Sequence, residues 1–137
     1  MFRTVWILLV AELLLLQTSI DTAWYDSLQK PSYQPPSYAF GLAWGMLYPL
    51  LAYTYYLLLQ SGSESELALF ETQLVLNLAW SFVFFRQKNL YLSTMMLLLM
   101  IILNLLLYRT FSKPWYLVYI AWLCFAFLLN LAILRLN

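Results

Sequence analysis

The 137-residue sequence contains no histidine, a single cysteine and only three glycines, and each shortage excludes a class of chemistry. Without histidine the chain lacks the commonest metal ligand and the commonest general base. Cys124 has no second cysteine to pair with, so no disulfide framework within the chain is expected. The glycines are too dispersed to form a phosphate-binding loop. Ordinary hydrolytic and metal-dependent catalysis is therefore not expected, and we predict no metal site.

Charge is also scarce. Charged residues make up 9% of the sequence and hydrophobic residues 64%, and the mean hydropathy is +0.77. Soluble domains carry about 25% charged residues, and a small soluble fold leaves too much surface exposed to hide so many apolar side chains. The net charge of +1 provides no basic patch for nucleic acid. The composition predicts an integral membrane protein that has lipid, and not nucleic acid, around it.

Long hydrophobic runs are abundant, and five of them are long enough to cross a bilayer as α-helices. These are Thr4–Ile20, Tyr38–Gln60, Glu66–Phe85, Asn89–Arg109 and Pro114–Leu136. The runs are continuous and rich in leucine, which favours helices over alternating membrane strands. We expect one all-α transmembrane domain over residues 1–137. As an alternative for the first run, Arg3 before a leucine-rich stretch that leads to Ala23 is typical of a secretory signal.

The first connection, residues 21–37, differs from the others. It is polar and contains Pro31, Pro35 and Pro36, so it cannot be helical throughout. The remaining connections are short, which makes consecutive helices antiparallel neighbours. Trp24, Trp115 and Tyr116 lie near span ends and are interpreted as interfacial aromatic residues.

Polar residues inside the spans are the strongest indication of a site, because hydrocarbon offers them no water. Gln73, Asn77, Trp80 and Phe84 repeat at helical spacing and so share one face of the third span. Similar stripes are Trp44, Tyr48, Leu51 and Tyr55 in the second span, and Trp122, Ala126 and Asn130 in the fifth. Facing inward, the stripes would line a small-molecule pocket. Alternatively, the amides only bond across helices.

Glu12 lies in the middle of the first span. A carboxylate there costs about 3 kcal/mol on insertion scales, so we expect it to be protonated, paired or next to a wet cavity. A functional and a structural role both remain open for it.

Three ordered motifs resemble one known family, the tryptophan-rich sensory protein/translocator protein (TspO/MBR, peripheral benzodiazepine receptor) family. The first motif contains Trp24, Tyr25, Leu28, Lys30, Pro31, Pro35, Pro36, Phe40, Trp44, Leu47 and Tyr48. The second contains Gln73, Leu74, Leu76, Asn77, Trp80, Phe84 and Phe85, and the third Trp122, Phe125, Ala126, Leu129 and Asn130. The sequence departs from the family pattern where Leu42 replaces a proline, and the first span has Glu12 and no glycine.

The resemblance implies five transmembrane helices around one central pocket, with the proline-rich loop as its lid. It implies that the ligand-binding residues are Tyr25, Pro35, Pro36, Trp44, Tyr48, Gln73, Asn77, Trp80, Phe84, Trp122 and Ala126. Expected ligands are tetrapyrroles first, as protoporphyrin or haem, and sterols second; no cofactor is required. The implied location is the bacterial cell membrane or the mitochondrial outer membrane. A homodimer is left open, because the third span lacks an apparent small-residue pattern.

The sequence thus predicts a membrane protein that binds flat, apolar ligands. One alternative is an enzyme in which Trp44 and Trp122 take part in light- and oxygen-dependent breakdown of a bound porphyrin. A transporter or a structural membrane subunit is a further alternative, although no inverted repeat supports transport.

Overall fold

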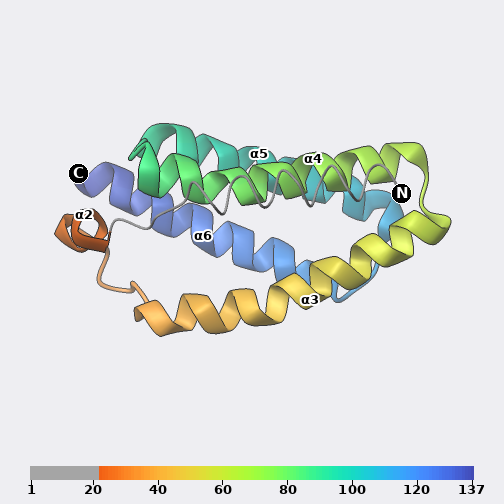
Figure 1. Cartoon of the computed structure of the whole chain (residues 1–137), viewed down its shortest axis with the longest axis horizontal. Helices are drawn as coiled ribbons and strands as arrows, with labels where there is room; N and C mark the ends of the chain where they lie inside the picture. The colour runs from red at the N-terminus through yellow and green to blue at the C-terminus, as the bar shows by residue number, and fades with distance from the viewer. Residues whose placement is uncertain (1–21) are drawn as a thin grey trace.

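The computed structural model describes residues 22–137, and every regular element in that range is helical. The elements are α2 (Thr22–Ser27), α3 (Ser37–Ser61), α4 (Glu64–Ser81), the π-helical turn η1 (Phe82–Arg86), α5 (Leu90–Phe111) and α6 (Tyr116–Leu136). Figure 1 shows α4, α5 and α6 running alongside one another, while α3 meets α4 at one end and diverges from α6 toward the other. The short helix α2 lies at the open end, near the C-terminal end of α6.

Four helices of the described chain are long and apolar enough to cross a membrane. They are Tyr38–Ser61, Glu64–Arg86, Leu90–Phe111 and Tyr116–Leu136, each within two residues of the corresponding sequence prediction. The all-helical membrane class is therefore confirmed for this part of the chain. The fifth predicted span, Thr4–Ile20, and its central Glu12 lie outside the described residues.

The predicted loop, residues 21–37, contains one element that the sequence did not reveal. Helix α2 occupies its first part, and irregular backbone follows from Leu28 to Pro36. The prolines are all in the irregular part, as expected from their missing N–H groups.

The turns between the long helices are set by local hydrogen bonds. Between α3 and α4, Gly62 lies so close to the Leu58 carbonyl that an added Cβ would approach its oxygen to 2.6 Å, which explains the glycine. Ser63 then begins α4 with a capping box, its side chain accepting from the Glu66 N–H while the Glu66 carboxylate accepts from the Ser63 N–H. Asn89 caps α5 by accepting from the Leu92 N–H at 2.9 Å.

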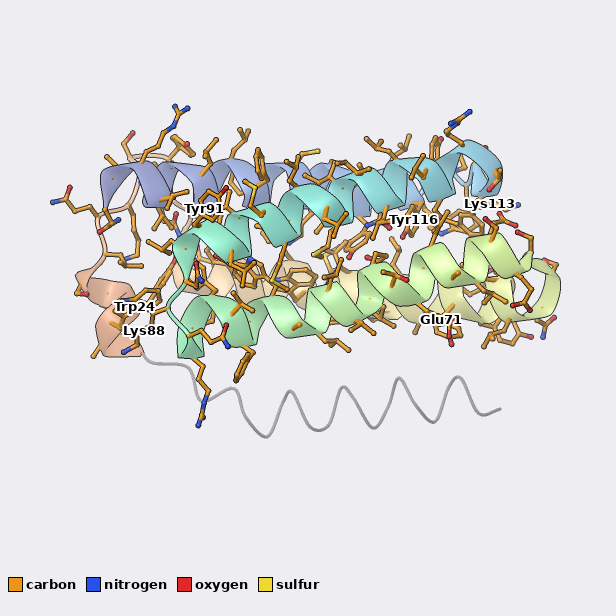
Figure 2. The ribbon with its side chains drawn as sticks, turned by 90° about the horizontal axis from the view of Figure 1, so that it is seen from above. Trp24, Glu71, Lys88, Tyr91, Lys113 and Tyr116 are labelled. Atoms are coloured by element: carbon orange, nitrogen blue, oxygen red, sulfur yellow. The ribbon has the colours of Figure 1, made fainter. Side chains whose placement is uncertain are left out.

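The core lies between α4, α5 and α6 and includes the part of α3 from Leu47 to Leu58. Its largest fully buried side chains include Phe70 on α4, Met100 and Leu107 on α5, and Tyr116 on α6. Figure 2 shows Tyr116 among the helices toward the end that carries Lys113, whereas Trp24 and Lys88 lie together at the opposite end. Side chains at that second end, where α2 and the loop lie, build the cavity described next.

Candidate functional site

A cavity of about 580 Å³ opens at the end of the bundle where α3 diverges from α6. Every described element contributes residues to its walls. They are Tyr25, Asp26 and Gln34 from α2 and the loop; Phe40, Gly41 and Trp44 from α3; Asn77, Trp80, Ser81, Phe84 and Phe85 from α4 and η1; Leu97 and Met100 from α5; and Trp122, Ala126, Leu129, Asn130 and Ile133 from α6. The lining is mostly apolar and aromatic with a few polar groups, which is the usual composition of a small-molecule site.

Two tryptophans meet where α3 faces α6. The rings of Trp44 and Trp122 are 6.1 Å apart between centroids and nearly perpendicular, at 88°. Tyr48, one turn after Trp44 on α3, stacks on it at 5.2 Å, and Phe40, one turn before, meets the edge of Trp122 at 5.9 Å. The second-span and fifth-span stripes therefore face each other, although Tyr48 itself is not part of the cavity lining.

A second aromatic wall depends on the π-helical turn. The Gln87 N–H donates to the Phe82 carbonyl, five residues earlier, at 3.0 Å. Because the turn is wider than an α-helical one, both Phe84 and Phe85 contact Trp80, at 4.9 and 6.1 Å between centroids. Two consecutive phenylalanines thus line the cavity, where the α-helical period had predicted only Phe84.

The loop is held over this end of the bundle by a hydrogen bond within it and by contacts with residues far away in the sequence. Within the loop, Gln34 donates from Nε2 to the Tyr25 hydroxyl at 2.6 Å. The backbone of Gln29 exchanges two hydrogen bonds with the Asn137 side chain, at 3.1 and 2.9 Å. Tyr25 packs on Phe85 at 5.7 Å. Burial, and secondarily the nearby Asp26 carboxylate, raises the pKa of the Tyr25 phenol above its usual value of 10.0.

Asn77 is the polar group of the third-span stripe that reaches the cavity. Its Oδ1 accepts from the Tyr48 hydroxyl at 3.3 Å, and its Nδ2 donates to the Tyr119 hydroxyl at 2.8 Å. Gln73, one turn earlier on α4, is fully buried and absent from the lining. Its Oε1 instead accepts from Tyr119 at 2.7 Å and from Asn104 at 3.1 Å.

Three members of this buried cluster were not among the predicted site residues: Asn104, Tyr116 and Tyr119. Tyr116 was interpreted as interfacial, but its side chain is fully buried and its hydroxyl donates to Asn104 Oδ1, so that interpretation is wrong. An amide at the middle of a span was the available signal for Asn104, since polar residues at membrane depth need partners. Nothing in the local pattern marked Tyr119.

Asn130 from the fifth-span stripe has a different set of partners. Its Nδ2 donates to Thr94 Oγ1 at 2.6 Å and to Ser93 Oγ at 3.2 Å, both on α5. It also lies in the cavity lining. The amide therefore links α5 to α6 directly beneath the cavity.

The predicted ligand-binding residues thus divide into two groups. Seven lie in the cavity lining: Tyr25, Trp44, Asn77, Trp80, Phe84, Trp122 and Ala126. Pro35, Pro36, Tyr48 and Gln73 lie outside it, two on the loop and two in contact with lining residues or the buried cluster. In the described part of the chain, no three carboxylate or cysteine side chains gather as they would around a metal ion.

A second, shallower groove of about 450 Å³ lies between the loop and the end of α6. Lys30 and Arg135 provide two positive charges there, beside apolar contacts from Pro31 and Leu136. Lys30 Nζ also lies 4.5 Å from the centre of the Tyr25 ring. This groove is therefore cationic, and it lies at the same end of the bundle as the Asp26 carboxylate of the cavity lining.

The chain is similar to proteins of one family over nearly its whole length. The sequence model of the TspO/MBR family matches residues 4–136. Tryptophan-rich protein TspO of Bacillus cereus is 35% identical over 127 residues, which cover 86% of this chain and 83% of that protein. The translocator protein of Homo sapiens is 35% identical over 130 residues, covering 83% of this chain and 75% of that protein.

Proposed function

Because the chain belongs to the TspO/MBR family of membrane proteins, we propose that it binds flat, apolar tetrapyrroles in the cavity between α3 and the α4–α6 helices. Protoporphyrin is the first candidate ligand, and sterols are the second. The observation that carries the proposal is the cavity itself. Its volume of about 580 Å³ falls in the range of about 300–1,000 Å³ that is usual for ligand pockets, and its walls include three indole and three phenyl rings.

The two aromatic walls suit a planar macrocycle. Trp44 stands edge-on to Trp122 on one side, and Trp80 stacks on Phe84 at 4.9 Å on the other. A conjugated ring that enters between them gains offset or edge contacts, each worth about 0.5–1.5 kcal/mol beyond burial. A sterol fills the same volume but lacks a π-face, so we rank it below the tetrapyrrole.

Charge at the loop end favours a ligand with carboxylates. Lys30 and Arg135 line the second groove at the loop end, whereas Asp26 is the charged residue in the lining of the cavity. In this proposal the propionate groups of a tetrapyrrole extend out of the cavity to the two cations. A neutral sterol has no use for these charges. With no histidine in the chain, haem iron would have to take a less common ligand such as Met100 of the cavity wall, so we favour the metal-free porphyrin.

The proposal includes the architecture around the ligand. In this proposal the first span, Thr4–Ile20, is the fifth helix of the bundle, and the proline-bearing loop is the lid of the cavity. The contacts that support the lid are those between Gln29 and Asn137 and between Gln34 and Tyr25, because they fasten the loop to α6 and to α2 at the mouth of the cavity.

A titration of the purified protein with protoporphyrin tests the proposal. In the dark we expect saturable quenching of tryptophan fluorescence, together with a shifted porphyrin absorbance band that empty detergent micelles do not produce. Trp115→Phe is the matched control, because Trp115 contacts Tyr53 at 5.8 Å outside the cavity and its loss should leave the affinity unchanged. Quenching that never saturates, or that micelles reproduce, contradicts the proposal.

One observation favours a second candidate function, the light- and oxygen-dependent degradation of the bound porphyrin. Trp44 and Trp122 touch at the cavity wall, so a photosensitising ligand would have two oxidisable indoles next to it. We expect Trp44→Phe and Trp122→Phe to keep porphyrin binding, because phenylalanine retains a π-face, and to slow the loss of porphyrin bands under light. Loss at the parent rate in both variants would leave the tryptophans as wall residues only.

A further inference from the structure

A chain of buried polar side chains runs from the cavity wall into the bundle. Tyr119 and Gln73 lie directly behind Asn77, and Asn104 and Tyr116 lie beyond them. These four side chains are fully buried, whereas Asn77 is 5% exposed and lines the cavity. Side-chain networks of this kind fix a unique arrangement when their donors and acceptors match, and the donor without a partner in this network is Gln73 Nε2.

One backbone carbonyl sets the direction of the hydrogen bonds in this row of buried polar side chains. The Met100 carbonyl is an unambiguous acceptor, and the Nδ2 of Asn104 donates to it at 2.8 Å. The amide of Asn104 is thereby oriented, so its nitrogen faces Gln73, which must present its oxygen. That oxygen also accepts the hydroxyl proton of Tyr119. Having donated its one proton, Tyr119 can only accept from the side chain on its other side.

The side chain on its other side is Asn77, whose amide is oriented as a result. Its nitrogen must face Tyr119, and this bond measures 2.8 Å. Its oxygen then lies on the opposite edge, toward Tyr48 of α3, from which it accepts a long bond of 3.3 Å. Asn77 lines the cavity and Tyr48 stacks on the lining residue Trp44, so this oxygen lies between α4 and α3 beside the cavity wall.

We propose that Tyr119 is a positioning residue, which holds Asn77 with its amide oxygen toward the cavity and so makes the pocket selective for ligands that donate a hydrogen bond there. The chemical class is a flat apolar molecule with a hydroxyl or N–H at its edge. The ligand donor replaces the long bond from Tyr48. This inference rests on the proposed function, because it concerns selectivity among ligands of the same cavity.

Two porphyrins with the same macrocycle test the selectivity: haematoporphyrin, with its two hydroxyethyl groups, and its bis-methyl ether, which lacks the two hydroxyl donors and has two more methyl groups. The comparison of their binding ratio between variants separates the effect of the donors from the effect of the added methyl groups. We expect the parent protein to bind the hydroxyl form about fivefold more tightly, which corresponds to about 1 kcal/mol and to one ordinary hydrogen bond. In Tyr119→Phe, Asn77 loses the acceptor that orients it, and we expect the ratio of the two dissociation constants to fall to about one.

Tyr116→Phe is the matched control. It also removes one buried hydroxyl, but Asn104 stays oriented by the Met100 carbonyl, so the preference should persist. If Tyr119→Phe does not fold, Asn77→Leu must bind both porphyrins equally. Equal binding of the pair by the parent, a preserved preference in Tyr119→Phe, or its loss in Tyr116→Phe overturns this inference and leaves the proposed function standing. Binding of neither porphyrin overturns both.

Discussion

Substitution of Asn137 by alanine should release the loop from the end of α6 and speed the escape of a bound ligand. The Asn137 side chain is joined to the backbone of Gln29 by two reciprocal hydrogen bonds, one accepted by Oδ1 at 3.1 Å and one donated by Nδ2 at 2.9 Å. They join the residue that caps the end of α6 to the loop. Alanine removes both, together with the bond that Nδ2 donates to the Ile133 carbonyl at 2.8 Å, and keeps the backbone bond from the Asn137 N–H to that carbonyl at 3.1 Å.

The magnitude follows from the exposure of the pair. A hydrogen bond contributes about 0.5–1.5 kcal/mol, and this pair is exposed, so the low end of about 0.5 kcal/mol for each bond applies. Two bonds give about 1 kcal/mol, which corresponds to about a fivefold change in the equilibrium for loop opening. If the loop must open before the ligand leaves, the dissociation rate rises by the same factor of about five.

Stopped-flow fluorescence measures this rate when porphyrin-loaded protein is mixed with an excess of empty lipid vesicles. Asn137→Asp provides an intermediate, because a carboxylate still accepts from the Gln29 N–H but no longer donates to the Gln29 carbonyl. We expect the rates to rank parent, aspartate variant, alanine variant. Equal dissociation rates in all three proteins would show that the loop does not gate the cavity.

Three further predictions follow from the site. Trp44→Ala should weaken porphyrin binding about fivefold in equilibrium titration, through the loss of a stacking partner worth about 1 kcal/mol, with little change in thermal stability. Replacing Pro35 and Pro36 together by glycine should speed ligand dissociation, because glycine widens the range of conformations open to the loop; an unchanged off-rate would argue against gating. The raised pKa of Tyr25 means that the folded protein keeps the phenol proton at a pH near 10, where the unfolded chain releases it. The free energy of unfolding should therefore fall as the pH rises above about 10. Thermal melting should show a smaller fall in Tyr25→Phe.

Much of the fold was accessible from the sequence because lipid imposes a simple rule. A span must satisfy its backbone internally, so long apolar runs are helices, and the four described ones end close to where the runs end. Helix α2 and the turn η1 were not predicted. Residues 22–27 sit in a polar connection next to prolines, and an added residue in a helical turn leaves no periodic signature.

The site was predictable only in part. Helical periodicity shows which residues share a face of a helix, but not which other helix that face contacts. Trp44 and Trp122 were marked by spacing and resemblance, and they do meet at the cavity. Gln73 shares the stripe of Asn77 but is turned toward Tyr119, because α5 and α6 approach α4 closely at its depth. Only the packing of three helices decides which amide of the stripe meets the cavity and which meets the core.

The π-helical turn from Phe82 to Arg86 carries a consequence for how this cavity can diverge among lineages. Such a turn is an α-helix that has taken in one extra residue, and each residue turns an α-helix by about 100°. A single deletion between Trp80 and Phe85 would restore the regular helix and bring Phe85 to four residues after Trp80, the spacing at which Phe84 now stacks on that ring. Insertions and deletions of one codon, and not only substitutions, can therefore reshape the cavity wall in one step.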